Sequence, residues 1–339
     1  MLAVTPLPAG QISSADPLEI ARILAARYPA QPVMSYIPAL SWSGQLRLSS
    51  LTGEPQWREK AIKDIQAFTS GQTSAIAEPY RLTSLAGAFA FSDASVIAAD
   101  HAAGLLFAKV AYFILPDKPE DDIKFQVGWT DDMFMAGAVL SRAGNEPHKA
   151  LRRMLKTYAA KLQRPDGLFI HAGNGPHAWG RGNGFALLGI TEALTHAPES
   201  WDAMPEAWAT RSEVLEIYRR HVAALVTHQS DDGSWRQVVD EPASYRELTV
   251  TAMTTAALAR GISRGWIDRK THEPIMNRGW QAVAARVNAD GTVKDVCSGT
   301  GAGPTKDYYL NRPVVNGADD RGGAMALLAA IEMATLRRR

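Results

Sequence analysis

Pro165-Asp-Gly-Leu-Phe169 is the stretch that decides the fold, because its pattern returns twice further along the chain. It recurs as Asp231-Asp-Gly-Ser-Trp235 and as Ala289-Asp-Gly-Thr-Val293, which places the glycines at positions 167, 233 and 291. Each copy follows an amphipathic stretch. A glycine there can adopt the left-handed conformation that ends a helix and redirects the chain. Leu51-Thr-Gly53 indicates an earlier turn of the same kind.

The spacing of these turns predicts the architecture. Successive glycines are 66 and 58 residues apart, which is too long for the common solenoid repeats. The spacing suits a helical hairpin with a functional loop at one end, and five or six such hairpins fit in 339 residues. We therefore expect an all-α fold, an (α/α)6 barrel in which six hairpins form a closed toroid. No Pro-, Gly- or Ser-rich linker divides the chain, so residues 1–339 are expected to form a single catalytic domain.

Apolar residues recur at helical spacing along most of the chain, whereas strand-like alternation is sparse and short. Asp16 is the expected N-cap of the first helix, directly before Pro17. The stretch 94–112 is more apolar than the others and is expected to be a buried helix. The expected helices span 18–27, 57–68, 94–112, 132–142, 148–162, 184–195, 212–228, 249–263, 274–287 and 322–336.

The bulk composition excludes several classes of function. A formal net charge of +1 provides no basic field for nucleic acid. No run of ~18 apolar residues is present, so no membrane span is expected. The first ten residues lack the cationic region of a signal peptide, and Cys297 is the only cysteine, so nothing requires an oxidising compartment. These features favour a cytoplasmic protein, either a monomer or a homodimer.

The stretch from Gly167 to Phe185 has the composition of a binding site. It contains six Gly, two His, two Asn, one Arg and one Trp within nineteen residues. Glycine lets the backbone approach a ligand closely, while the polar side chains supply hydrogen-bond donors and Trp supplies a flat apolar face. This mixture indicates the wall of a site for a polar, ring-shaped ligand. The stretch contains no Asp or Glu.

Six motifs, in order along the chain, resemble those of the unsaturated glycuronyl hydrolases of glycoside hydrolase families 88 and 105, especially the unsaturated rhamnogalacturonyl hydrolases. The resemblance runs from about Leu51 to Glu332. The motifs are Trp129-Thr-Asp-Asp-Met-Phe-Met135, Gly167-Leu-Phe-Ile-His171, Trp179-Gly-Arg-Gly-Asn-Gly184, Trp235-Arg-Gln-Val-Val-Asp240, Glu247-Leu-Thr-Val-Thr-Ala-Met253, and Asp307-Tyr-Tyr309 with Asn316.

The resemblance implies an enzyme with a distinctive reaction. Polysaccharide lyases leave a C4=C5 double bond on a terminal uronic acid, and this family hydrates that enol ether. A carboxylic acid protonates C4, water adds at C5, and the resulting hemiketal opens and releases the rest of the sugar. The implied fold is an (α/α)6 barrel with a cleft at one end, the implied partner is an oligosaccharide substrate, and no metal or organic cofactor is needed.

By the resemblance, Asp131 corresponds to the first family aspartate, which holds sugar hydroxyls and helps to position water. Asp132 is adjacent, and two buried acids raise each other's pKa. The structural alternative is a helix N-terminus, at which Thr130 or Asp131 is the cap and Asp132 faces the positive end of the helix dipole.

The family's His-x-Trp-Asp run reads His171-Ala-Gly-Asn174 in this chain, so its catalytic Asp is replaced by Asn174. An amide cannot donate an acidic proton, although proton transfer contributes ~10²–10⁴-fold to such reactions. Three explanations stay open. Asp131 or Asp132 takes over the role, or His171 or His177 acts as the acid. In the third, hydration is lost and the protein binds sugar without catalysis, or cleaves a saturated glucuronide or rhamnoside.

The remaining candidates are expected to bind the sugar. The guanidinium fork of Arg181 suits a uronate carboxylate, and Arg236 is a second candidate for it. Trp179 and Trp235 can stack on a sugar ring, whereas core packing is the alternative for both. Glu247 begins a helix and can simply stabilise its N-terminus. The candidate substrate-binding residues are Trp129, Asp132, Trp179, Arg181, Asn183, Trp235, Arg236, Gln237 and Glu247.

Overall fold

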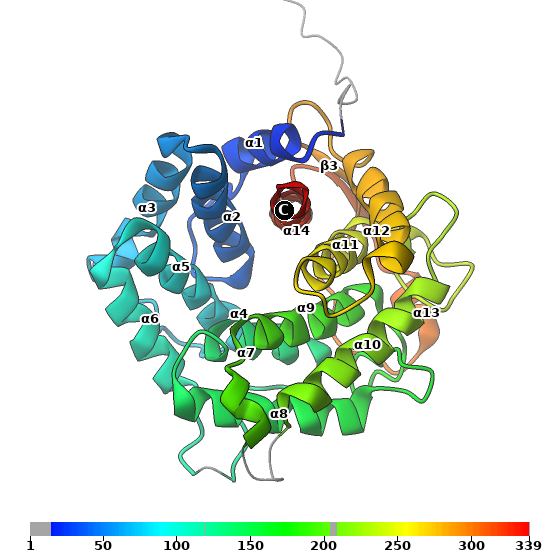
Figure 1. The fold of residues 1–339 in the computed structure, drawn as a ribbon, viewed down its shortest axis with the longest axis horizontal. Helices are drawn as coiled ribbons and strands as arrows, with labels where there is room; N and C mark the ends of the chain where they lie inside the picture. Colours follow the sequence, from blue (N-terminus) through cyan, green and yellow to red (C-terminus); the bar gives the residue numbers. More distant parts are fainter. Residues whose placement is uncertain (1–14, 119, 204–208, 339) are drawn as a thin grey trace, which may run out of the picture.

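The computed structural model of the chain describes residues 15–118, 120–203 and 209–338, and its long helices form two concentric rings (Figure 1). Outer and inner helices alternate along the chain. The inner helices are α2 (Tyr36–Thr52), α5 (Phe89–Ala98), α7 (Thr130–Leu140), α9 (Gly180–His196), α11 (Leu248–Ser263) and α14 (Asp320–Arg337). The outer helices are α1 (Pro17–Arg27), α3 (Pro55–Thr69), α6 (His101–Phe113), α8 (Asn145–Leu162), α10 (Arg211–Thr227) and α12 (Arg269–Ala284).

The inner ring closes on itself. α7 packs on α9, α9 on α11, α11 on α14, α14 on α2, and α2 on α5. The short α4 (Leu82–Leu85) and the 3-10 helix η1 (Ala86–Ala88) complete the circle between α5 and α7. Each inner helix also contacts an outer helix adjacent to it in sequence or across the ring closure. The predicted (α/α)6 barrel is therefore confirmed. No helix in the described part of the chain is long and apolar enough to cross a membrane.

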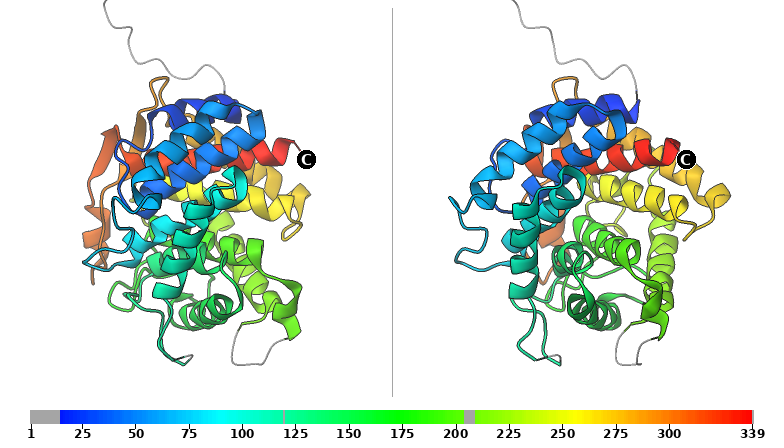
Figure 2. Two further views of the ribbon diagram at one scale, coloured as in Figure 1. Left: turned by 90° about the vertical axis from the view of Figure 1, so that its left-hand side faces the viewer. Right: turned by 60° about the vertical axis from the view of Figure 1, so that its left-hand side comes forward.

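Minor elements cluster at one end of the barrel. β1 (Trp235–Arg236) pairs antiparallel with β2 (Arg246–Glu247), and β3 (Val293–Cys297) pairs antiparallel with β4 (Val314–Gly317). The side views place β3 at the opposite end from the C-terminus of α14 (Figure 2). The other minor elements are α13 (Lys306–Leu310), on the right-hand side of Figure 1, and the 3-10 helix η2 (Glu199–Ala203).

The three Asp-Gly turns are copies of one hairpin. In each, the glycine N–H donates to a carbonyl three residues earlier, at 3.0 Å for Gly167, 2.8 Å for Gly233 and 2.8 Å for Gly291. All three glycines have positive φ, from 79° to 97°. They do not cap helices, however, because α8, α10 and α12 end five to seven residues earlier. The expectation of a helix cap holds at Gly53, which ends α2 in the left-handed conformation.

Each turn packs against the next outer helix, which explains why the glycine is needed. A Cβ on Gly167 would lie 2.6 Å from the carbonyl oxygen of Arg220 in α10, and one on Gly233 would lie 2.2 Å from that of Arg278 in α12. The third turn meets α1 and so closes the outer ring. There Arg27 Nη1 and the Tyr28 hydroxyl donate to the carbonyls of Asp290 and Gly291, both at 2.9 Å.

Two sequence predictions fail for physical reasons. The stretch 94–112 is not one buried helix, because Ala99 takes φ 54° and Asp100 caps a new helix by accepting from Ala103 N at 3.0 Å. On α6, Leu105 and Tyr112 are 61% and 58% exposed. Helix α2 went unpredicted because the inner ring buries it on almost every side, so it has no polar face to give a helical period.

Charged side chains from all six inner-ring positions meet at the end of the barrel remote from β3. Arg260 of α11 donates to Glu192 of α9 and to Glu332 of α14, both at 2.5 Å. Arg142, two residues after α7, bonds Glu192 at 2.6 Å and Asp93 of α5 at 3.2 Å. Arg47 of α2 bonds Glu332 at 2.7 Å. We call these six residues the axial ion-pair network.

Candidate active site

A hydrogen-bonded chain of three side chains lies at the β3 end of the barrel. His171 Nε2 is 3.1 Å from Asp131 Oδ2, and His171 Nδ1 is 2.9 Å from the Tyr309 hydroxyl. Asp131 lies in the first turn of α7, His171 in the hairpin that precedes α9, and Tyr309 in α13. The structure thus brings together two of the four residues predicted to be catalytic, and it adds Tyr309.

The hydrogen bonds assign the tautomer of His171. The Tyr309 hydroxyl accepts from Gly303 N at 3.2 Å, so its own proton is free to point at His171 Nδ1. His171 Nε2 then carries the ring proton and donates it to Asp131 Oδ2. This direction of donation orients the Asp131 carboxylate and leaves Oδ1 as its second acceptor.

An aromatic cage surrounds His171. Its ring centroid lies 4.4 Å from that of Trp179, 5.2 Å from that of Trp129 and 5.7 Å from that of Tyr309. His171 is fully buried, whereas the Asp131 side chain is 15% exposed. His171 therefore holds Asp131 from a buried position, and the role of acid predicted for His171 stays a prediction.

Asp132 points away from Asp131, back into the loop before α7. Its Oδ2 accepts from the backbone N–H groups of Val127 and Gly128, both at 2.8 Å, and from the Tyr158 hydroxyl at 2.7 Å. Burial raises the pKa of Asp132 to about 6, although the hydrogen bond from Tyr158 acts in the opposite direction. Asp132 thus anchors the loop, and its predicted contact with substrate stays a prediction.

The other two residues predicted to be catalytic lie outside the Asp131–His171–Tyr309 chain. Asn174 is exposed at the tip of a tight turn, in which Ala172 and Gly175 exchange backbone hydrogen bonds at 3.3 and 3.0 Å. His177 is half-buried, and its Nε2 lies 3.2 Å from the Pro304 carbonyl oxygen. The tight turn therefore leaves the Asn174 side chain exposed to solvent.

Arg181, predicted to bind a uronate carboxylate, bonds backbone carbonyls in this structure. Its side chain is buried over the Trp179 ring, and its Nη1 and Nη2 donate to the carbonyls of Cys297 at 2.7 Å and Ser298 at 2.5 Å. Arg181 therefore supports the loop after β3 instead of facing a carboxylate. The sequence analysis missed Arg321, in the first turn of α14, which also donates to the Cys297 carbonyl, at 3.2 Å, and is 22% exposed.

Five further candidates are buried and support the fold in this structure, and their predicted contacts with sugar stay predictions. Trp235 is fully buried and donates to the Leu225 carbonyl at 2.7 Å. Glu247 is the N-cap of α11 and accepts from Cys297 N at 2.9 Å, as its structural alternative predicted. The buried supports are Trp179, Asn183, Trp235, Gln237 and Glu247.

Two of the predicted binding residues keep some exposure. Trp129 is half-buried beside His171, and a Cβ on Gly301 would lie 3.6 Å from the Trp129 ring. Arg236 is half-buried and donates to the Ser244 carbonyl at 2.8 Å. Within residues 15–118, 120–203 and 209–338, no three His, Cys, Asp or Glu side chains group as metal ligands. The chemistry that this end of the barrel offers is therefore that of one oriented carboxylate beside an aromatic surface.

Tyr36, the first residue of α2, connects Asp131 with the cationic side of the site. Burial raises the pKa of Tyr36, and Arg181, Arg321 and Asp131 are all close enough for their charges to act on it. The first turns of α2, α7 and α14 thus converge at the β3 end. Arg321 and Tyr36 were not predictable from spacing, because they come from helices far apart in sequence. The signal for Arg321 was its place after Asp319-Asp320, in the first turn of the last helix.

Comparisons with known proteins agree with this geometry. Residues 21–337 match the family described as Glycosyl Hydrolase Family 88. The unsaturated 3S-rhamnoglycuronyl hydrolases of Alteromonas sp. (strain LOR) and Formosa agariphila are 29% and 27% identical to the chain, each over 49% of its length. Those matches cover 42% and 48% of the relatives, so the chain matches less than half of each.

A solved structure shows the same fold. A possible member of glycoside hydrolase family 105 from Klebsiella pneumoniae superposes with a TM-score of 0.82 at 16% identity, over 100% of this chain and 99% of its own. The resemblance inferred from the six motifs is confirmed by these matches. On the family match over nearly its whole length, the chain belongs to glycosyl hydrolase family 88.

Proposed function

We propose that this protein hydrates the C4=C5 enol ether of an unsaturated uronic acid at the end of an oligosaccharide, with Asp131 as the acid and base. The observation that carries the proposal is the Asp131–His171–Tyr309 chain, which presents one oriented carboxylate at the loop end of a family 88 barrel. The whole barrel is proposed to form a single catalytic domain.

Asp131 performs both proton transfers. His171 fixes Oδ2, so the transferred proton is carried on Oδ1. Protonated Asp131 gives this proton to C4 as the π electrons form the new C–H bond, and positive charge develops at C5 beside the ring oxygen. Water adds at C5 and returns a proton to the carboxylate, so one water is added overall. The hemiketal then opens at the C5–ring oxygen bond, and C1 releases the remaining sugar.

Arg321 is the proposed partner of the uronate carboxylate. Its Nη1 donates to the Cys297 carbonyl and lies 3.8 Å from Asp319 Oδ2, and its side chain also bonds Tyr36, so a fork toward a carboxylate would be formed by the N–H groups that these partners do not use. It is partly exposed, whereas Arg181 is buried and committed to two carbonyls. Trp129 is the proposed apolar face for the sugar ring.

The names of the relatives support a substrate in which the unsaturated uronic acid is linked to rhamnose. Two of them are named unsaturated 3S-rhamnoglycuronyl hydrolases. We therefore place sulfated and unsulfated rhamnose-linked disaccharides first among the substrates to be tested.

A conventional glycosidase is the alternative, but among the described residues the second carboxylate that it requires is missing beside Asp131. Such an enzyme needs two carboxyl groups ~5–10 Å apart across the bond. The candidates beside Asp131 were Asp132, which is turned into the loop before α7, and Glu247, which caps α11. Both are buried, so neither can act across a sugar bound at Asp131.

The test is the loss of ultraviolet absorbance of the enol ether when the protein is mixed with unsaturated disaccharides. The expected result is turnover of at least one rhamnose-linked substrate, and no turnover of its saturated analogue. Absence of turnover across pectin-, ulvan-, chondroitin- and gellan-derived substrates would overturn the proposal. Release of sugar from the saturated analogue would instead favour a glycosidase.

A further inference from the structure

Three aromatic rings form an exposed cluster that the reaction at Asp131 does not use. Phe113 and Phe125 stack with centroids 5.4 Å apart and planes 25° apart. Tyr80 packs against both rings, at 5.2 and 5.5 Å. Tyr80 is 39% exposed, and Phe113 and Phe125 are half-buried. We call these three residues the aromatic shelf.

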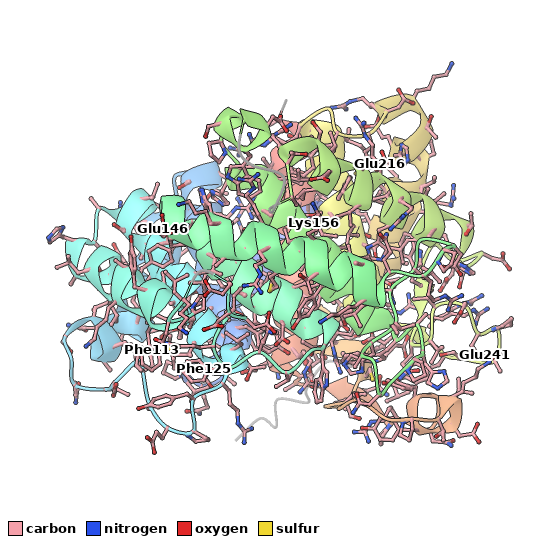
Figure 3. All side chains as sticks on the ribbon, turned by 90° about the horizontal axis from the view of Figure 1, so that it is seen from below. Phe113, Phe125, Glu146, Lys156, Glu216 and Glu241 are labelled. Carbon is pink, nitrogen blue, oxygen red and sulfur yellow. The ribbon has the colours of Figure 1, made fainter. Side chains whose placement is uncertain are left out.

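The aromatic shelf lies at the same end of the barrel as Asp131. Phe113 and Phe125 are at the end where Glu241 lies, and Glu241 pairs at 2.9 Å with Lys306, the first residue of α13 (Figure 3). α13 also carries Tyr309, the partner of His171.

The shelf and Asp131 are parts of one loop-and-helix unit. Phe125 is four residues from Trp129, so their Cα atoms are at most about 14 Å apart. Val127, which lies between them, is 59% exposed. Val127 thus exposes an apolar side chain between Trp129 and Phe125, and Phe125 contacts Tyr80, so the span of the loop is one that an oligosaccharide of a few units can cover.

The loop that carries Phe125 is held rigidly. Lys124 N donates to the Ile114 carbonyl at 3.0 Å, and the N–H groups of Val127 and Gly128 donate to Asp132. Between these anchors Phe125 takes φ 66°, which is unfavourable for a bulky side chain. Strain of this kind persists where surrounding structure imposes it, and it is concentrated at ligand-binding positions. The hydrogen bonds thus hold an apolar ring half-exposed at the mouth of the barrel.

We propose that the aromatic shelf binds the sugar units beyond the bond that is broken, by stacking against the apolar faces of their rings. This inference rests on the proposed function for the identity of the oligosaccharide. Its consequence is a preference for chains longer than a disaccharide, because only these reach from Asp131 to the shelf.

The experiment measures binding and turnover as a function of chain length. Calorimetry gives Kd for saturated rhamnose–glucuronate di- and tetrasaccharides, and kcat/KM is measured for the unsaturated di- and tetrasaccharides. We compare the wild type with Tyr80→Ala and with Phe125→Gly, in which glycine accepts the positive φ without strain. The matched control is Leu105→Ala, which removes an exposed apolar side chain from the middle of α6.

The expected result is tighter binding of the tetrasaccharide than of the disaccharide by the wild type. Both shelf variants should lose roughly three- to tenfold in tetrasaccharide affinity, with disaccharide turnover unchanged. The Leu105→Ala control should match the wild type. Equal affinity of the wild type for the di- and tetrasaccharide, or full tetrasaccharide affinity in the shelf variants, would overturn the proposal that the aromatic shelf binds sugar. Failure of the proposed function would give a different result from failure of the shelf. In that case no unsaturated substrate would be consumed, but binding would still depend on chain length.

Discussion

The two ends of this barrel differ in how their carboxylates are paired. At the remote end, the axial ion-pair network joins three arginines and three carboxylates, one residue from each inner-ring position. At the β3 end, Asp131 is bonded by His171, which is bonded by Tyr309, and no Lys or Arg forms a salt bridge with Asp131 among the described residues. One end therefore pairs each carboxylate with arginine, and the other holds one carboxylate that a histidine and a tyrosine orient.

This difference separates structural from reactive carboxylates. Burial acts to raise the pKa of Glu332, but Arg260 and Arg47 outweigh it and lower that pKa to about 2. A carboxyl held in this way stays ionised at all working pH values and cannot exchange protons. Asp131 has an oriented oxygen and partial exposure without such pairing, which are the conditions for proton transfer. The predictions below test this contrast.

The largest effect is expected at Asp131. Asp131→Asn keeps the size of the side chain but removes the acid, so kcat/KM for an unsaturated disaccharide should fall by ~10²–10⁴-fold. The measurement is the initial rate of loss of enol-ether absorbance. Asp307→Asn, which changes an exposed acid at the same end, is the control and should keep full activity. Undiminished activity of Asp131→Asn would exclude Asp131 as the acid.

The remote end should respond in stability instead of catalysis. Arg260→Met leaves Glu192 and Glu332 each without one partner, which should cost ~3–5 kcal/mol in the free energy of unfolding. Chemical denaturation measures this loss, and kcat of the folded variant should be unchanged. The control is Arg264→Met, an exposed arginine beside the same network, for which no loss above ~0.5 kcal/mol is expected. A stable Arg260→Met variant would show that the network is dispensable.

Asp132 should impose a pH dependence opposite to that of the ion-paired carboxylates. Its pKa is raised from 3.8 to about 6 by burial, so the folded state binds its proton more tightly than the unfolded state. Between pH 4 and 6 the unfolded chain loses this proton first, and stability should fall as pH rises, by about 3 kcal/mol in total. Above pH 6 the contribution is fully lost.

The variant Asp132→Asn isolates this contribution. The difference in unfolding free energy between wild type and Asp132→Asn should shift against the wild type from pH 4 to pH 7. Denaturant titrations at several pH values measure it. A difference that is constant with pH, or that favours the wild type as pH rises, would contradict the raised pKa.

A smaller effect is expected at Tyr309. Tyr309→Phe keeps the ring but removes the proton that His171 Nδ1 accepts, so His171 is free to take the other tautomer. Loss of one such hydrogen bond should lower kcat by about tenfold, with little change in KM. The pH–rate profile should shift as well, whereas a purely structural role would leave that profile unmoved. An unchanged kcat and an unchanged pH–rate profile would show that Tyr309 has no role in the reaction.

The smallest effect is expected at Asn174. Asn174→Asp restores the acid of the family pattern, but the side chain lies on an exposed turn outside the Asp131 chain. We expect kcat/KM to remain that of the wild type, with Asn174→Ala as the control. A gain of about tenfold or more in the Asp variant alone would move the acid to this turn.

The fold was largely predictable because the outer helices and the turns carry local signals. α3 and α10, for example, each have one buried face and one charged face, and the Asp-Gly turns repeat in sequence. α2 carries no such signal, since neighbours on every side bury Trp42 and Gln45 alike. An inner helix of a ring is recognised only once the ring is known.

The candidate site was predictable in part. Asp131 and His171 were expected and lie together, because each belongs to a compact motif. Composition could not reveal that the polar partner of both Arg181 and Glu247 is the backbone near Cys297 and not a ligand. Arg181 donates to that backbone, and Glu247 accepts from it. The same residue types support backbone and bind ligands. For Arg181 the partner that decides between these roles, the Cys297 carbonyl, is more than fifty residues away along the chain.

The contact between α1 and the third Asp-Gly turn has a consequence during synthesis. Tyr28 bonds Gly291, a partner 263 residues further along the chain. At a ribosomal rate of ~5–20 residues per second, this partner emerges roughly 13–50 s after Tyr28. Until then, Ile20, Ala21 and Leu24 of α1 lack one of the surfaces that later cover them. The contact that joins α1 to the third Asp-Gly turn therefore forms only after the helices between them have emerged.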